Sequence, residues 1–387
     1  MNAHLPSPRS LVFLDGLRGF AALYVMIGHA RWLLWEGYSS GYIRHPESYS
    51  PPEKMLVYFF SAFKYGHHAV LLFFIISGFV IHLRYSKQMV RQREKAAFDW
   101  LAFFKRRAKR LYPPLIFSMI VTAICDAIGF RLGYVIYHQQ TPYALINQLA
   151  LPSYGIRVAA GNLLFLMGPY TPMWGTNGPL WSLMFEWWFY MIYPLFWLIS
   201  RRSIAWATTI MAGLFVMSFF PQLWPLFLLR SVFSLMLTWW FGALLADMYT
   251  GRLQLPFQPI AMFTLLIPFA LFMPFPSTYP VIQDVLFSLG IAGLLSWCLF
   301  TRTYLWVLHF LERLKPIGDM SYTLYVIHFP ILVLLSGWLM SRHPNHLLPS
   351  HFGWVLAGIL TNIGVAYAAH LVVEKPFRTA NRTITGS

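Results

Sequence analysis

The sequence predicts an all-α, polytopic transmembrane helical bundle with about ten spanning helices. Hydrophobic residues make up 58% of the 387 residues, whereas Asp, Glu, Lys and Arg together make up only 11%. Soluble domains carry roughly a quarter charged residues. The apolar residues here also gather in stretches of about 20, which is the length that an α-helix needs to cross a bilayer.

Ten apolar stretches are the candidates for these spanning helices. A further stretch, residues 56–63, is apolar but too short to span, and we expect it to extend the second helix or to lie at the interface. The ten candidates cover about residues 11–35, 66–84, 109–130, 178–199, 203–220, 224–248, 257–275, 281–301, 317–340 and 351–373.

The positive charge of the chain lies mainly on one side of the predicted spans. The chain has 29 Lys and Arg residues against 13 Asp and Glu residues, a net charge of +16. Such a charge would suit nucleic acid, but its place in short loops between apolar spans indicates a lipid bilayer and no nucleic-acid partner. By the positive-inside rule, the multi-pass chain has both termini in the cytoplasm.

The whole chain, residues 1–387, is expected to form one membrane-embedded domain. Its parts are a helical core (10–376), a basic cytoplasmic loop (85–108), an outer loop (131–177) and a short cytoplasmic tail (377–387). The two cysteines lie in apolar segments without the spacing of metal ligands. We therefore expect no metal site and no disulfide.

The first predicted span carries ionisable side chains among its aliphatic residues. Arg18 and His29 are 11 residues apart. A helix turns about 100° and rises about 1.5 Å per residue, so these side chains share one face and lie about 16 Å apart along the axis. Ionisable groups inside a span are costly, and they indicate a functional site by default.

A pair of arginines stands at the predicted cytoplasmic start of the third span. Arg107 and Arg110 are three residues apart and therefore share a helix face. Planar guanidinium groups at this position suit a ligand that carries phosphate. The alternative is simple orientation, because basic residues flank many spans.

The fourth span carries an acid among aromatic side chains. Glu186 follows Trp181 by five residues and lies about two turns into the membrane. It is either a functional carboxylate or a structural partner for a buried base. The aromatic residues around it are typical of an interfacial belt and of helix packing.

Polar side chains also interrupt two other spans. In the ninth span, Ser321, Tyr325 and His328 are spaced to lie on one side of a helix, and His328 suits a site residue and a satisfied core histidine equally well. In the second span, Ser77 precedes Gly78, and such a small pair favours close helix packing over a binding role.

Six motifs together resemble the bacterial integral-membrane acyltransferase 3 family over almost the whole chain. The first motif contains a basic residue, Arg18, and a histidine, His29, with ten residues between them. The motifs are LDGLRGFAALYVMIGHA (14–30), FFIISGFVI (73–81), FFKRRAKRLYPP (103–114), GPLWSLMFEWWFYMIYP (178–194), GDMSYTLYVIHFP (318–330) and VVEKPFR (372–378).

Two positions depart from the pattern of the family. Ala69 stands where the second-helix signature usually has Gly, and Trp187 and Trp188 stand where a second acid or amide often follows Glu186. The second departure weakens any mechanism that needs two carboxylates there. The chain resembles the stand-alone form of the family, without the fused extracytoplasmic hydrolase-like domain.

The resemblance implies an enzyme of the bacterial inner membrane that transfers an acyl group. Members typically move the group, here most simply acetyl, from cytoplasmic acyl-CoA to a hydroxyl group. The acceptor would be a glycan, a lipid-linked sugar or a small hydroxylated molecule. Acyl-CoA would be a co-substrate, with acetyl-CoA favoured, and no metal would be needed.

Hydroxyl acylation needs a general base, and histidine has an unperturbed pKa near 6.5 that suits this role. Our hypothesis makes His29 the base, oriented by Glu186, or alternatively an acyl-carrying nucleophile. The runner-up function is a transporter or flippase that uses the intramembrane charges as a substrate path. In the acyltransferase hypothesis, Arg18, Arg107 and Arg110 bind the CoA phosphates or polarise the thioester, and Ser77, Trp181, Ser321, Tyr325 and His328 line the cavity.

Overall fold

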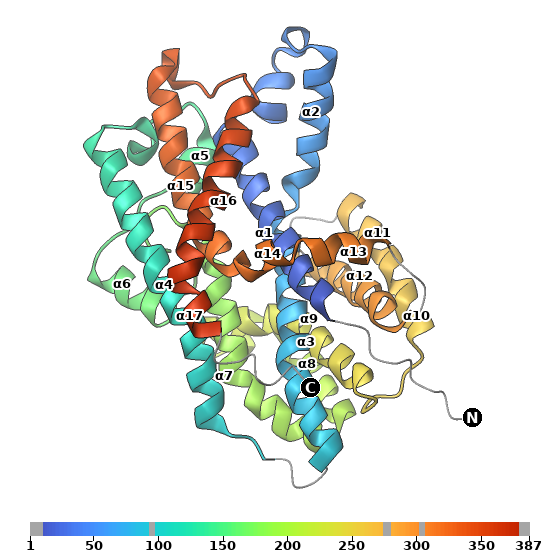
Figure 1. The fold of residues 1–387 in the computed structure, drawn as a ribbon. Helices are drawn as coiled ribbons and strands as arrows, with labels where there is room; N and C mark the ends of the chain where they lie inside the picture. The colour runs from blue at the N-terminus through green and yellow to red at the C-terminus, as the bar shows by residue number, and fades with distance from the viewer. Residues whose placement is uncertain (1–10, 93–96, 274–279, 302–305, 379–387) are drawn as a thin grey trace. The chain divides into compact units, whose positions relative to one another are not determined.

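The computed structural model describes residues 11–92, 97–273, 280–301 and 306–378, which fold almost entirely as helices (Figure 1). Within these residues the sole β-type pairing is an isolated bridge between Met167 and Thr171. The predicted all-α fold is therefore confirmed. The longer helices are α1 (Val12–Leu33), α3 (Gly66–Gln92), α4 (Trp100–Arg131), α7 (Trp181–Arg202), α8 (Ile204–Met217), α9 (Phe227–Tyr249), α12 (Pro280–Phe300), α15 (Ser321–Arg342) and α16 (Gly353–Val373).

The helices fall where the apolar stretches predicted them. Seven described helices are long and apolar enough to cross a membrane: α1 with its continuation to Tyr42, α3, α4, α9, α12, α15 and α16. Two shorter apolar segments, α8 and residues 257–272, occupy two more of the ten stretches. The last stretch is α7, which is 22 residues long. The chain is thus a polytopic helical bundle, as expected.

The segment predicted as a basic loop is largely helical. Helix α3 continues to Gln92, and α4 begins at Trp100. Residues 85–108 contain no Gly or Pro, and their many Lys, Arg, Gln and Ala residues are good helix formers. The Asp99 carboxylate accepts a hydrogen bond from the Ala102 N–H at 2.9 Å, which caps the start of α4.

The described chain divides into two compact units. Unit 1 comprises residues 1–18, 68–105 and 185–315, and unit 2 comprises residues 19–67, 106–184 and 316–387. The chain passes from one unit to the other within α1, α3, α4 and α7, and again after α13 (Trp306–Arg313). Residues 379–387 of the predicted tail lie outside the described residues.

Unit 1 is built on a close crossing of α3 and α9. A Cβ atom on Gly78 would overlap the Trp239 carbonyl oxygen, and one on Gly242 would overlap the Ile75 carbonyl oxygen. This reciprocal contact supports the packing role of the Ser77–Gly78 pair. Helix α12 packs against α9 and against α10 (Phe257–Met262) and α11 (Leu266–Phe272), with the short 3-10 turn Phe263–Leu265 between the last two.

In unit 2, the predicted outer loop folds as short helices that are anchored to α4. The buried Asp126 carboxylate of α4 accepts hydrogen bonds from the Thr176 N–H at 2.9 Å, the Thr176 hydroxyl at 2.8 Å and the Tyr154 hydroxyl at 2.6 Å. These three donors compensate for the burial of the carboxylate. The loop includes α5 (Ala144–Leu149) and α6 (Ile156–Leu163).

The rest of unit 2 packs around α15 and α16, which lie side by side (Figure 1). The stretch at 56–63 belongs to a separate helix, α2 (Pro51–Ser61), which precedes α3. Glu53 accepts a hydrogen bond from the Ser50 N–H at 2.8 Å and so starts α2. Short elements complete the unit: a π-helix (Gly37–Tyr42), α14 (Lys315–Asp319) and α17 (Lys375–Arg378).

Candidate active site

The two histidines singled out in α1 and α15 meet inside unit 2. His29 Nδ1 lies 2.8 Å from His328 Nε2. Their rings stack with centroids 5.1 Å apart and an interplanar angle of 16°. His328 is fully buried, whereas His29 is partly exposed. The sequence predicted both residues as site residues, but not that they are partners.

The contacts of His328 fix where the protons of a neutral pair lie. His328 Nδ1 is 2.7 Å from the Tyr325 carbonyl oxygen and 3.2 Å from the Leu324 carbonyl oxygen. A carbonyl only accepts, so Nδ1 carries the proton and Nε2 is the acceptor. His29 must then donate from Nδ1, which leaves a lone pair on His29 Nε2. No described residue has a hydrogen bond to that Nε2 atom.

A proline and an asparagine support the turn that carries His328. Pro330 has no N–H, so the Val326 carbonyl loses its helical hydrogen bond. The Asn177 side chain takes this place and donates to the Val326 oxygen at 2.8 Å. Asn177 also donates to the Thr122 hydroxyl at 3.1 Å. The segment before α7 is therefore joined to α15 two residues before His328.

The other predicted cavity residues of unit 2 have structural contacts. The Tyr325 hydroxyl donates to the Pro179 carbonyl oxygen at 3.1 Å and accepts from the Ser182 hydroxyl at 2.9 Å. The buried Ser321 hydroxyl donates to the Gly318 carbonyl oxygen at 2.8 Å. The Trp181 ring stacks on His67 with centroids 5.6 Å apart. Their lining of a substrate cavity stays a prediction.

In unit 1, Glu186 is at the end of a hydrogen-bond chain that includes Ser77. The Tyr190 hydroxyl donates to the Glu186 carboxylate, and Tyr190 and Ser77 hydroxyls lie 3.2 Å apart. The Trp239 indole N–H is 3.4 Å from the Ser77 oxygen. Because Tyr190 gives its only proton to Glu186, every donor in this chain points toward the carboxylate. Glu186 and His29 belong to different units, so the orienting role of Glu186 stays a prediction.

The predicted arginines lie on helices, as expected. Arg18 forms an ion pair with Asp15, one turn earlier in α1. Arg107 and Arg110 are both partly buried on the continuous helix α4, so they share a face. This arrangement is compatible with the phosphate-binding hypothesis, which stays a prediction for all three residues.

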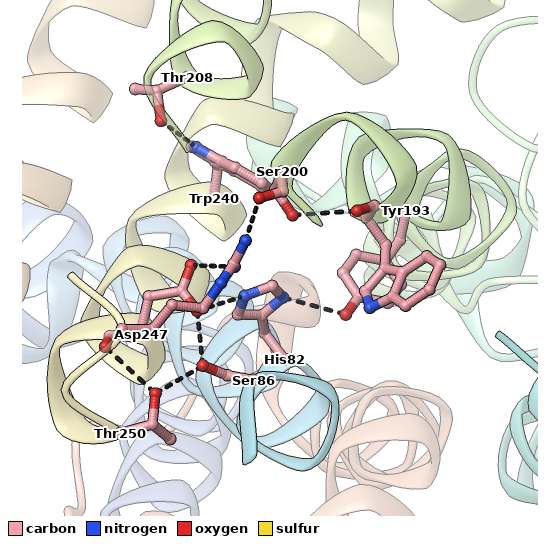
Figure 2. A network of polar contacts seen from close by, with 10 residues as sticks. His82, Ser86, Tyr193, Ser200, Thr208, Trp240, Asp247 and Thr250 are labelled. Atoms are coloured by element: carbon pink, nitrogen blue, oxygen red, sulfur yellow. Dashed lines mark hydrogen bonds and ion pairs between the residues drawn. The ribbon is translucent and has the colours of Figure 1, made fainter. Parts of the chain in front are cut away.

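A second buried histidine site, in unit 1, was missed by sequence reasoning (Figure 2). His82 Nε2 lies 3.0 Å from the Asp247 carboxylate, and His82 Nδ1 lies 3.0 Å from the Tyr193 hydroxyl. Arg252 donates to both Asp247 oxygens at 3.1 and 3.0 Å and also to the Ser200 carbonyl. The Ser86 hydroxyl donates to Asp247 at 2.5 Å. These contacts tie α3, α7 and α9 together.

The sequence held only a weak signal for this network. His82 stands alone in an apolar helix, and Asp247 lies two residues before the end of α9. The one available hint is that Ser86 follows His82 by four residues, which places both polar groups on one face of α3. Among the described residues, no group of three His, Cys, Asp or Glu side chains is arranged to hold a metal ion.

Comparison with known proteins identifies the family. The family model described as "Acyltransferase domain" matches residues 11–370. Protein 2 in the picA locus of Rhizobium radiobacter is 28% identical over 185 residues, which cover 46% of this chain and 78% of that protein. O-acetyltransferase OatA of Staphylococcus aureus is 28% identical over 191 residues, which cover 49% of this chain and 25% of that protein.

The chain therefore matches only about a quarter of the length of the O-acetyltransferases. No solved structure matches the chain. The family model, in contrast, covers nearly the whole sequence with one domain, in agreement with the six motifs. Its span includes His29, His328, the arginine pair and the helices that carry them. The chain thus belongs to this acyltransferase family, as a multi-pass membrane acyltransferase.

Proposed function

We propose that the protein is a membrane O-acetyltransferase that moves an acetyl group from acetyl-CoA to a hydroxyl of a sugar or glycan, with His29 as the general base. The observation that carries this proposal is the contact between His29 and His328, which leaves His29 Nε2 without a hydrogen bond to any described residue. The relatives named O-acetyltransferase support the reaction class.

The transfer step uses this lone pair directly. His29 Nε2 takes the proton of the acceptor hydroxyl while the oxygen attacks the thioester carbonyl. The C–O bond forms, the C–S bond breaks, and the proton then passes from His29 to the CoA thiolate. During the step His29 keeps its Nδ1–H hydrogen bond to His328 Nε2, so the ring does not rotate away from the acceptor.

In our proposal, the donor acetyl-CoA binds at the cytoplasmic end of the helical bundle. Arg107 and Arg110 present two guanidinium groups on one face of α4, and such groups bind phosphate oxygens through paired hydrogen bonds. Arg18, which forms an ion pair with Asp15, is a further candidate for a phosphate contact in our proposal. The protein is placed in the bacterial inner membrane with both termini in the cytoplasm, so acetyl-CoA reaches this end.

The test is acetyl transfer by the full chain purified in detergent, with labelled acetyl-CoA. His29→Ala should abolish transfer while the protein still expresses and folds; substantial remaining activity would refute the role of His29. Glycans from a knockout strain and its parent, compared by mass spectrometry, would identify the acceptor. An unchanged glycan profile together with substrate movement across vesicles would instead favour a transporter.

The donor site has a separate test. Changing both Arg107 and Arg110 to Gln should weaken acetyl-CoA binding by at least about 100-fold, because two hydrogen bonds to charged groups are lost and each contributes about 1.5–3 kcal/mol. Arg131→Gln, an exposed position at the other end of α4, is the matched control. Equal affinity in the double variant and the control would place the donor elsewhere.

A further inference from the structure

A pocket of about 130 Å3 opens in unit 2 where α1 ends and the π-helix begins. Its walls come from these two elements, from α2 and from the segment that starts α5. A water needs about 10–15 Å3 by the same measure, so the space holds on the order of ten small groups. That is close to the size of one hexose ring. Its polar and aromatic lining includes Arg31, Trp32, Trp35, Glu36, Ser40 and Tyr143.

Two charged side chains line the pocket, Arg31 and Glu36, and they do not form an ion pair with each other. Arg31 has no hydrogen bond or ion pair to any described residue, and its Nε atom is buried. Glu36 accepts a hydrogen bond from the Tyr49 hydroxyl at 2.6 Å through Oε1. A buried donor without a partner is unfavourable, and a ligand hydroxyl would satisfy it.

The aromatic walls are held in place by their polar ends. The Trp35 indole N–H donates to the Ser350 carbonyl oxygen at 2.8 Å, and the Tyr143 hydroxyl accepts from the Leu348 N–H at 2.9 Å. Walls that are ordered before binding reduce the entropy cost of binding. Flat aromatic faces beside paired hydrogen-bonding groups are the chemistry that recognises a sugar ring, which has C–H faces and hydroxyl edges.

The pocket also adjoins the histidine pair. The Trp32 ring has its centroid 6.0 Å from that of His29 and meets it edge-on. Trp32 follows His29 by three residues, so it lies about one turn further along α1. In the predicted topology this is the outer end of the helix, away from the cytoplasmic donor.

We propose that this pocket binds a neutral sugar ring of the acceptor. Arg31 donates to ring hydroxyls, Glu36 accepts from them, and Trp32 packs on the C–H face of the ring. The carboxylate of Glu36 disfavours a phosphate or another anion in the same space. This inference rests on the proposed function, since it places the acceptor beside the base.

The binding test needs neither a donor nor turnover. Saturation-transfer NMR on the full chain, in a detergent without a sugar headgroup, would use maltotetraose and chitotetraose as probes. We expect a signal from at least one saccharide with the wild type and with His29→Ala. The signal should fall at least fivefold in Arg31→Gln and in Trp32→Ala. Arg44→Gln, an exposed arginine outside the pocket, is the matched control and should behave as wild type.

The outcomes separate this inference from the proposed function. No signal from either saccharide, or equal signals in wild type and Arg31→Gln, would overturn the sugar site. Phosphate binding that Arg31→Gln removes, without saccharide binding, would also overturn it. Full transfer by His29→Ala would refute the proposed base but would not affect the saccharide signal. Circular dichroism of each variant would exclude misfolding as the cause of a lost signal.

Discussion

The two units each contain a buried histidine, and the partners of these histidines differ. In unit 1, His82 lies against the Asp247 carboxylate, which also receives Arg252 and Ser86 (Figure 2). In unit 2, His29 has another imidazole as its partner. Both ring nitrogens of His82 have a partner, because Asp247 lies against Nε2 and the Tyr193 hydroxyl lies against Nδ1. One ring nitrogen of His29, in contrast, has no hydrogen bond to any described residue, so we propose a structural role for the first site and a catalytic role for the second.

The largest effect should come from His29. His29→Gln should lower the rate of acetyl transfer about 10²- to 10⁴-fold, the usual contribution of a general base. His82→Gln, the same change at the other site, should keep near wild-type turnover per folded molecule at low temperature. Release of CoA measured for both purified variants checks this. Equal losses in the two variants would erase the distinction between the sites.

The next effect should be on stability and should appear at the other site. Asp247→Asn should lower the free energy of unfolding by about 2–3 kcal/mol, because it leaves the partly buried Arg252 charge without a carboxylate. Denaturation in mixed micelles measures this change. Asp99→Asn is the control, since this residue is exposed and asparagine caps a helix as well as aspartate does. Similar stability of the two variants would mean that the contacts around Asp247 do not stabilise unit 1.

A smaller effect is expected from the partner of His29. His328→Leu removes the acceptor that holds the His29 ring, and a misplaced catalytic group typically costs about 100-fold in rate. His328→Gln retains an acceptor oxygen and should recover part of that loss, with little change in the KM for acetyl-CoA. If the His328→Leu and His328→Gln variants have the same transfer rate, the hydrogen bond between the two histidines does not position the base.

The smallest effect should come from Ser77, on the chain that leads to Glu186. Ser77→Ala removes one link, and the Tyr190 hydroxyl still donates to Glu186. We expect a loss of about 1 kcal/mol in the free energy of unfolding and a change in transfer rate below about fivefold. A loss as large as that of His29→Gln would make the Glu186 chain part of the catalytic machinery.

The helices could be predicted from the sequence because each long helix corresponds to a continuous run of mostly apolar residues. The family motifs likewise lie in short segments, and they are the basis for predicting His29, Arg107 and Arg110 as site residues. The histidine pair could not be predicted, because His29 and His328 are 299 residues apart and meet only in the folded bundle. The helical extension of the basic segment was also missed, since its charge suggested a loop.

The partners of buried polar groups were the least predictable feature. Asp126 attracted no attention in the sequence, yet its carboxylate accepts three hydrogen bonds from the segment that was predicted as an outer loop. Asn177 precedes a Gly-Pro pair at the end of the segment predicted as an outer loop. Its role depends on Pro330, more than 150 residues away, which leaves a carbonyl that only tertiary structure can satisfy.

Pro330 also has a consequence for how the base could be adjusted. The Val326 carbonyl accepts its hydrogen bond from Asn177 and not from an N–H of its own helix. The turn before His328 is therefore fixed by a loop as well as by α15. A substitution in that loop can therefore shift His328 by fractions of an ångström without changing any residue of the transmembrane helices. The position of His328, the partner of the proposed base His29, therefore depends on this loop as well as on the transmembrane helices.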